Sequence, residues 1–233
     1  MDTALRRRLS AAALVASLAL LPGCALVPSL GEITPVATDD AADSSGDSDS
    51  PEQPDPDLPP SELTFEAGAE LDPAKWSVQW GDAFLADESF SVLSPDDGNG
   101  NWSYLDGANQ CEISFYQGGM ADLDMSQDDR TLTDDFLASV LAGTVTGSTR
   151  ADVDEHAFDH ELKGMVGVES VEFRAIWGSA ADGGTWLHAG RMFGLHEAAL
   201  YVGIRCPAGF EADEEFAKLT DSHLGVVVGP LTG

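Results

Sequence analysis

Basic residues are scarce in this sequence: 11 Lys and Arg stand against 41 Asp and Glu, giving a formal net charge of −30. Three of the bases, Arg6, Arg7 and Arg8, lie in the first ten residues, so the remainder of the chain is more acidic still. A field of this sign repels phosphate backbones and anionic lipid, and we therefore expect no nucleic-acid partner. It keeps a protein soluble and attracts cations or basic partners.

Long apolar runs are also nearly absent. The one candidate, at 9–21, follows the three arginines and leads into Pro22-Gly23-Cys24. A positive start, a short apolar run and a small-residue exit form the layout of a secretory signal peptide, and the run is too short to span a bilayer comfortably. The sequence therefore predicts a signal peptide over residues 1–23 and an exported remainder.

The four residues Leu21, Pro22, Gly23 and Cys24 resemble the lipobox of bacterial lipoproteins. In that motif the cysteine becomes the first mature residue, and its thiol forms a thioether to diacylglycerol. The resemblance implies lipidation of Cys24 and a chain held on the extracytoplasmic face of the cell membrane, since several acyl chains anchor more firmly than one. Pro22 departs from the small or β-branched residue usual at its position. An ordinary cleavable signal with an unmodified cysteine is the alternative.

Cysteine is rare, with three residues in the chain. If Cys24 carries lipid, Cys111 and Cys206 remain as an even pair in an oxidising compartment, and each lies in a strand-like run. We predict a structural disulfide between them. Two buried free thiols or a metal pair are the alternatives, and the lack of a CxxC motif argues against redox catalysis.

Aromatic residues are missing from residues 25–62, where Pro, Ser, Asp, Glu and Gly dominate. Such a segment buries too little apolar surface to offset the entropy of ordering. We therefore expect residues 24–62 to form a lipidated, disordered acidic tether. Residues 63–233 are then expected to form a single extracytoplasmic domain.

Within that domain, strand and helix patterns alternate. Apolar residues recur at every second position in the runs 76–80, 90–92, 102–104, 111–115, 171–177, 186–193 and 200–206. Helical spacing follows Thr131, which with Asp134 resembles a capping box, and stops at Gly143. A second helix is expected to begin near Glu211. This order predicts an α+β fold with a mostly antiparallel sheet packed by two or more helices.

The order of elements resembles the PsbP-like lipoproteins of actinomycete bacteria. The likeness depends on the lipobox, the tether, and an SFYQG strand at 114–118 followed by an LTDDFLASVLAG helix at 132–143. It implies helices that cover an antiparallel sheet and a non-enzymatic adaptor or binding role. It implies no site residues.

The best metal-ligand candidates are His156 and His160 with Asp159, in a run crowded with carboxylates. Residues four apart share a face, and two imidazoles with a carboxylate suit zinc. The run is not HExxH, because Ala157 follows His156, so a solvated polar strand or loop is the favoured interpretation. No metal or other cofactor is predicted. Residues 97–103 mimic the start of a calcium loop, but a hairpin turn explains them more simply.

Two further residue types stand out. The tryptophans could line a pocket, although in a small domain they more often belong to the core: Trp76, Trp80, Trp102, Trp177 and Trp186. Among the scarce bases, Arg174, Arg191 and Arg205 all lie in predicted strands. They could share a sheet surface and pair with acids, which raises an anion pocket as a hypothesis.

No nucleophile elbow, SxxK pair or phosphate-binding glycine loop is present, so we expect no enzyme. The leading hypothesis is a membrane-anchored, non-catalytic binding or accessory lipoprotein whose partner is a cell-envelope protein or a small ligand. The runner-up is a lipid or small-ligand carrier with a pocket between sheet and helix. A secreted hydrolase is the third.

Overall fold

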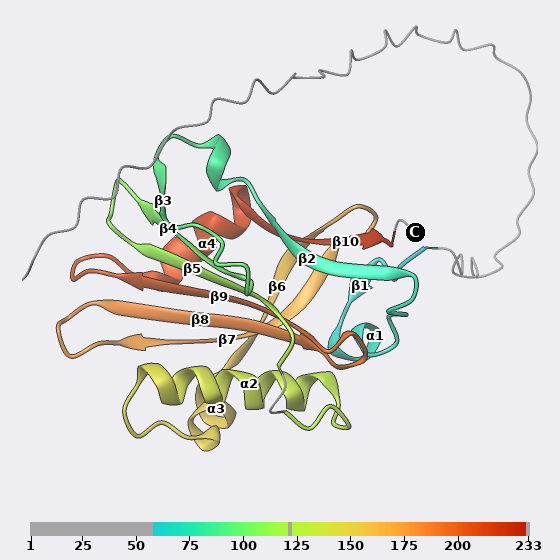
Figure 1. Cartoon of the computed structure of the whole chain (residues 1–233). Helices are drawn as coiled ribbons and strands as arrows, with labels where there is room; N and C mark the ends of the chain where they lie inside the picture. The colour runs from blue at the N-terminus through green and yellow to red at the C-terminus, as the bar shows by residue number, and fades with distance from the viewer. Residues whose placement is uncertain (1–57, 121–122, 232–233) are drawn as a thin grey trace, which may run out of the picture. The chain divides into compact units, whose positions relative to one another are not determined.

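The computed structural model describes residues 58–120 and 123–231 of the chain (Figure 1). The predicted signal peptide, Cys24 and the tether up to residue 57 lie outside the described residues. In the part that is described, no helix combines the length and the hydropathy needed to cross a bilayer. This part folds into a large curled sheet that carries several helices.

The described strands form one 10-stranded sheet. They are β1 (Glu62–Leu63), β2 (Trp76–Asp82), β3 (Phe90–Ser94), β4 (Asn101–Asp106), β5 (Glu112–Gly118), β6 (Phe158–Met165), β7 (Ser170–Ser179), β8 (Thr185–Phe193), β9 (Ala198–Cys206) and β10 (Leu224–Pro230). Their order is β2-β10-β6-β7-β8-β9-β5-β4-β3, with β1 paired to β7. Only the β6–β10 and β1–β7 pairs are parallel. The prediction of a mixed fold with a mostly antiparallel sheet is confirmed.

The sheet curls, so that strands far apart in its order come together. Trp80 on β2 donates its backbone N–H to Gln117 Oε1 of β5 at 2.8 Å. The indole N–H of Trp80 also donates to the Tyr116 carbonyl at 3.1 Å. Because β2 ends the sheet on one side and β5 lies near the opposite end, these bonds fold the sheet around a concave inner face.

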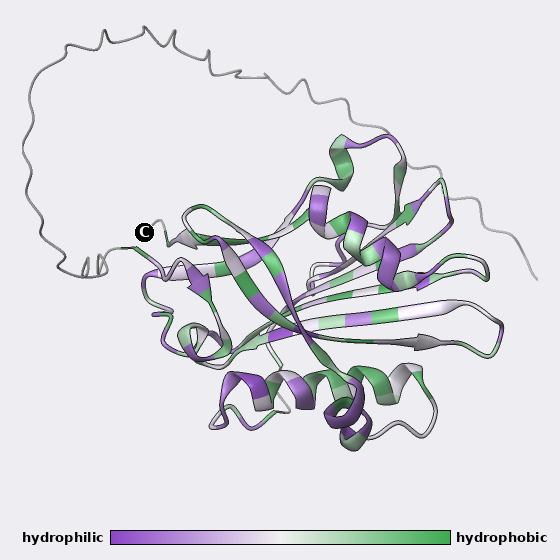
Figure 2. Cartoon of the chain, turned by 180° about the vertical axis from the view of Figure 1, so that it is seen from behind, coloured by the Kyte–Doolittle hydropathy of each residue, from purple (hydrophilic) through white to green (hydrophobic). Residues whose placement is uncertain are grey.

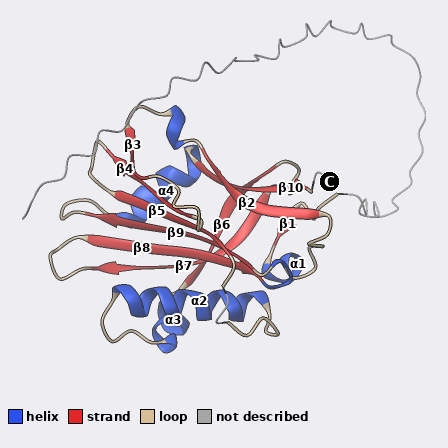
Figure 3. Ribbon diagram, viewed as in Figure 1, coloured by secondary structure: helices blue, strands red, loops and turns tan. Residues whose placement is uncertain are grey.

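Helices cover both faces of the sheet. They are α1 (Phe65–Gly68), α2 (Asp129–Thr144), α3 (Arg150–His156) and α4 (Ala212–Ser222), with the short 3-10 turns η1 (Phe84–Ala86) and η2 (Gly194–His196). Helices α2 and α3 lie beneath β7, β8 and β9, whereas α4 lies on the other side of these strands (Figures 1 and 3). We call the α4 side the inner face and the α2 side the outer face.

The inner face holds the main hydrophobic core. Apolar and polar residues alternate along the strands, as Figure 2 shows, and the apolar set points inward. Large rings dominate this core: Trp80, Phe84, Phe115, Phe173, Phe193 and Phe216. Burial of one such side chain stabilises a fold by roughly 1.5–3 kcal/mol, so this face is the main source of stability.

Helix α2 begins earlier than the sequence predicts. Its N-cap is Asp128, whose Oδ1 accepts the backbone N–H of Thr131 at 2.9 Å. The expected capping box of Thr131 and Asp134 is therefore wrong, because a carboxylate three residues before Thr131 satisfies the same orphan N–H group. Asp134 lies inside the helix and bonds Arg174 of β7. The C-terminal end, at Thr144, is one residue beyond the expected Gly143.

Two regions differ from the expectation. The acidic run expected to be a polar strand or loop begins as α3, capped by Thr149 and Asp152, which is wrong for that part, and continues directly into β6, which agrees with a strand. Strand β10 at the C-terminus was not assigned, although it forms the link between β2 and β6. Two glycines interrupt its apolar run, and no alternation marks it, because the strand is buried along most of its length.

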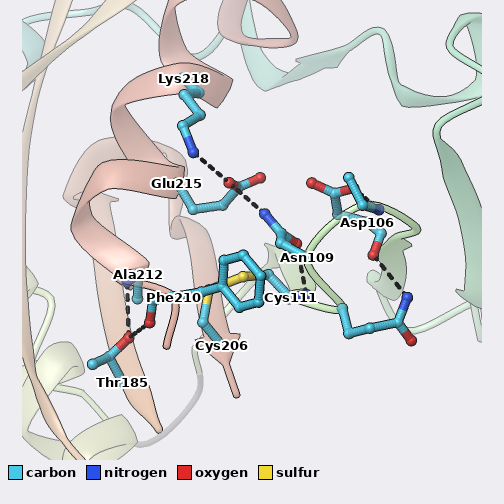
Figure 4. Close-up of a disulfide and its surroundings, with 11 residues drawn as sticks. Asp106, Asn109, Cys111, Thr185, Cys206, Phe210, Ala212, Glu215 and Lys218 are labelled. Carbon is cyan, nitrogen blue, oxygen red and sulfur yellow. Dashed lines mark hydrogen bonds and ion pairs between the residues drawn. A yellow bond between two sulfur atoms is a disulfide. The ribbon is translucent and has the colours of Figure 1, made fainter. Parts of the chain in front are cut away.

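Cys111 and Cys206 form a disulfide with Cα atoms 4.2 Å apart, so this predicted pairing is confirmed (Figure 4). Glu112 of β5 pairs with Arg205 of β9, and the cysteines occupy the next opposed positions of the same ladder. Beside the bridge, Glu215 of α4 accepts a hydrogen bond from Asn109 Nδ2 at 2.7 Å. The bridge thus fastens β5 to β9 next to the inner helix.

Candidate functional site

A pocket of about 660 Å³ lies between the C-terminal end of α2 and the outer face of β5, β8 and β9. Its walls come from Glu112, Ser114, residues 143–146, residues 179–181, Trp186, His188, Tyr201, Ile204 and Arg205. We call it the α2 pocket. The runner-up hypothesis expects a pocket between sheet and helix, and this one has that position, although its lining is mixed rather than purely apolar.

A row of three aromatic rings lies along the pocket. Trp186 and His188 are two residues apart on β8, and their ring centroids are 5.1 Å apart at an interplanar angle of 28°. Tyr201 of β9 continues the row, 5.8 Å from His188 at 26°. Two glycines make this row possible, because a Cβ at Gly203 would collide with Tyr201 and one at Gly178 would collide with Trp186.

His188 is the centre of a hydrogen-bonded chain. Its Nδ1 lies 2.7 Å from Tyr201 Oη, and its Nε2 lies 3.2 Å from Thr144 Oγ1 at the end of α2. Burial lowers the pKa of His188 to about 4 and raises the pKa of Tyr201. Both side chains are therefore neutral near pH 7, and the pocket interior carries polar groups without charge.

Charge is confined to the mouth of the pocket. Glu112 of β5 and Arg205 of β9 are opposed on neighbouring strands. Arg205 pairs with Asp182 at 3.3 Å, and both side chains are exposed. Within the described residues Glu112 forms no ion pair, so Glu112 and Asp182 together outweigh Arg205 and the mouth has a net negative charge.

The metal-ligand candidates are not brought together. His156 is exposed at the end of α3, whereas Asp159 and His160 lie on β6 and point to opposite faces of the sheet. The His160 ring packs 4.9 Å from the Phe216 ring, and Asp159 bonds arginines of α2 and β7. Across residues 58–120 and 123–231, His, Cys, Asp and Glu form no group of three that could hold a metal ion. The expected shared face is wrong, because the chain changes from helix to strand after His156.

The three strand arginines do not form an anion pocket. Arg174 pairs with Asp134 of α2 at 2.8 Å on the outer face. Arg191 is fully buried and pairs with Asp129 at 3.2 Å. Of these three arginines only Arg205 lines the α2 pocket, and it pairs with Asp182, so a carboxylate lies against each of the three guanidinium groups.

The tryptophans divide between core and pocket. Trp80 lies in the inner core, Trp76 and Trp102 pack against it, and Trp177 is 49% exposed. Only Trp186 lines the α2 pocket. The sequence did not single out His188, Tyr201, Thr144 or Glu112 as site residues. The spacing of Trp186 and His188, two apart in a strand, was the one available signal for a shared face.

A Ser–His–Asp row lies at the C-terminal end of α4. His223 Nδ1 is 2.6 Å from Ser222 Oγ, and its Nε2 is 2.9 Å from Asp87 Oδ2. These residue types form hydrolase triads, but Ser222 also donates to the Lys218 carbonyl at 2.8 Å. The negative end of the helix dipole lies here as well, and it opposes the oxyanion that acyl transfer requires. We interpret these hydrogen bonds as a structural contact that holds the end of α4 against the turn that precedes β3.

Comparisons with protein-family models, with curated proteins and with solved structures find no match for this chain. The lipobox and PsbP-like resemblances therefore stay predictions. The functional case depends on the α2 pocket and on the chemistry of its lining.

Proposed function

We propose that this protein is a membrane-anchored, non-catalytic binding lipoprotein that holds a small organic molecule in the α2 pocket. The anchor is lipid on Cys24, and an acidic tether carries the folded domain away from the extracytoplasmic face of the cell membrane. This combines the leading hypothesis with the pocket of the runner-up.

The observation that carries the proposal is the pocket itself. Its volume of about 660 Å³ lies within the roughly 300–1,000 Å³ typical of small-ligand sites. The ring row of Trp186, His188 and Tyr201 offers apolar contact area, and the surrounding hydroxyls can fix the orientation of a ligand.

The same geometry favours binding over catalysis. Both nitrogens of His188 are engaged, by Tyr201 and by Thr144, so neither is available to a substrate. Since general acid–base catalysis needs a group that reaches the reacting atoms with a pKa near the working pH, the neutral His188 fits a structural role in a binding site.

A pocket-filling variant tests this function. Gly143 lines the pocket and a Cβ added there meets no atom within 4 Å, so we expect Gly143→Phe to place a ring at the pocket wall. Ala142→Phe adds the same ring one residue earlier, at an exposed position that does not line the pocket. We expect ligand-observed NMR with a chemically diverse fragment library to detect binders for the parent protein and A142F that G143F loses. Binding that G143F retains, or no binder at all, contradicts the proposal.

The location is tested separately. The intact product from cells is expected to carry acyl mass on Cys24 and to enter the detergent phase, whereas Cys24→Ser is expected to lose both properties. A parent protein without lipid mass that washes into the medium would remove the anchor from the proposal.

A further inference from the structure

The hydroxyl groups around His188 already donate hydrogen bonds to acceptors within the protein. Thr144 Oγ1 donates to the Val140 carbonyl at 3.1 Å, as helix-terminal threonines do. His188 Nε2 must therefore donate to Thr144, and because a neutral imidazole carries one N–H, Nδ1 accepts the Tyr201 hydroxyl proton. Ser114 Oγ donates to the Gly203 carbonyl at 3.1 Å. Thr144 Oγ1 uses one lone pair for His188, and Tyr201 also interacts with the Ser114 side chain, so the lone pairs that remain on these oxygens are the acceptors of this part of the pocket.

The end of α2 adds more acceptors. Residues 143–146 line the pocket, and α2 has no basic residue in its last turn. Within the described residues no donor reaches the carbonyls of Gly143 and Thr144. Unsatisfied C-terminal carbonyls carry the negative end of the helix dipole and favour a cation nearby.

The charges at the mouth of the pocket also favour a cation. In the described part of the chain the Glu112 carboxylate forms no ion pair, and the guanidinium of Arg205, which lies opposite it on β9, pairs with Asp182. The chain as a whole carries a formal net charge of −30, which draws cations from solution and repels anions. Trp186 supplies apolar contact area on this face, and aromatic rings also attract cations.

Resting on the proposed function, we propose that the α2 pocket binds an organic cation: a protonated primary or secondary amine carried on a flat apolar body. The N–H groups of the ammonium donate to acceptors among Tyr201 Oη, the carbonyls at the end of α2 and Glu112, and the apolar body packs beside Trp186.

Three probes of similar shape but different charge distinguish the effect of charge from the effect of shape on binding. They are 2-phenylethylamine, 2-phenylethanol and phenylacetate. At pH 7 the amine is expected to bind at least about tenfold more tightly than either other probe, with an affinity that falls as salt is added. Binding is measured by calorimetry and ligand-observed NMR, and G143F is expected to abolish it. Equal or tighter binding of the alcohol or the anion overturns the amine proposal and leaves the proposed function intact. If none of the three probes binds, the amine proposal is also overturned. The fragment-library experiment then tests the proposed function by itself.

Glu112→Gln sharpens the test, with Glu88→Gln as the matched control for net charge, since Glu88 is exposed and does not line the pocket. We expect E112Q to weaken amine binding by about three- to tenfold and to leave 2-phenylethanol unchanged. E88Q is expected to change neither. An amine affinity that is equal in E112Q and E88Q contradicts the role of the carboxylate.

Discussion

The two faces of the sheet differ in how completely they are covered. The inner face closes around α4 with the main apolar core and a disulfide. The outer face is covered by α2 and α3 over part of its length, with buried ion pairs such as Arg174–Asp134, and then opens into the α2 pocket. The inner face therefore holds the larger core, whereas the outer face has two smaller buried clusters beneath α2 and α3 and a pocket where α2 ends.

The contrast predicts unequal effects for two aromatic truncations. Phe216→Ala on the inner face is expected to destabilise the protein by about 3–5 kcal/mol, because a ring that is 2% exposed leaves a cavity. Trp186→Ala on the outer face is expected to cost about 1–2 kcal/mol, because its ring borders an open pocket. Urea denaturation measures the free energy of unfolding of both variants. Similar losses of stability would contradict the difference between the two faces.

Removal of the disulfide tests the inner face a second way. The bridge spans a sequence separation of 95, and the double variant Cys111→Ala/Cys206→Ala is expected to lose about 2–5 kcal/mol. Ligand binding to the folded remainder is expected to persist, because the bridge does not line the α2 pocket. A pocket that no longer binds in a variant that is still folded would show that the two faces are coupled.

His188 gives the outer face a distinct pH dependence. Its pKa is lowered from 6.5 to about 4, so between these values the unfolded chain binds a proton that the folded protein does not. The contribution of His188 to the free energy of unfolding therefore falls as the pH falls from 6.5 to about 4, by about 3 kcal/mol in total. Denaturation of the parent and of His188→Gln from pH 7 to pH 4 measures the effect as a difference. Parallel curves for the two proteins would contradict the burial of a neutral histidine.

Glu215 beside the inner helix is expected to show the opposite sign and the smallest effect. Burial raises the pKa of Glu215, and the nearby Asp106 raises it further. The folded protein then holds this proton more tightly than the unfolded chain, so the contribution to stability is lost as the pH rises. Glu215→Gln keeps an acceptor for Asn109 and is expected to be more stable than the parent at pH 7 by about 1 kcal/mol or less. At pH 3 the gain is expected to vanish, and a gain that persists there would point to a cause other than ionisation.

Local patterns determined much of the fold. Alternation placed β2, β5, β7, β8 and β9, and helical spacing placed α2 and α4, because apolar residues recur in each of them at the period of its backbone. The disulfide followed from counting cysteines in a compartment that the sequence predicts to be oxidising. Where that periodicity was missing, in β10, whose apolar run is continuous, and in the acidic run that contains α3, local patterns failed.

Only the tertiary structure decided the site. Tyr201 and Thr144 lie far from Glu112 along the chain, and the pairing of β5 with β9 and the docking of α2 bring all three to one pocket. The sequence by itself determined a strongly acidic chain with a sheet, helices and one cysteine pair. Which polar side chains meet, and whether they end up neutral, depends on burial and on the register of distant strands, which no local pattern encodes.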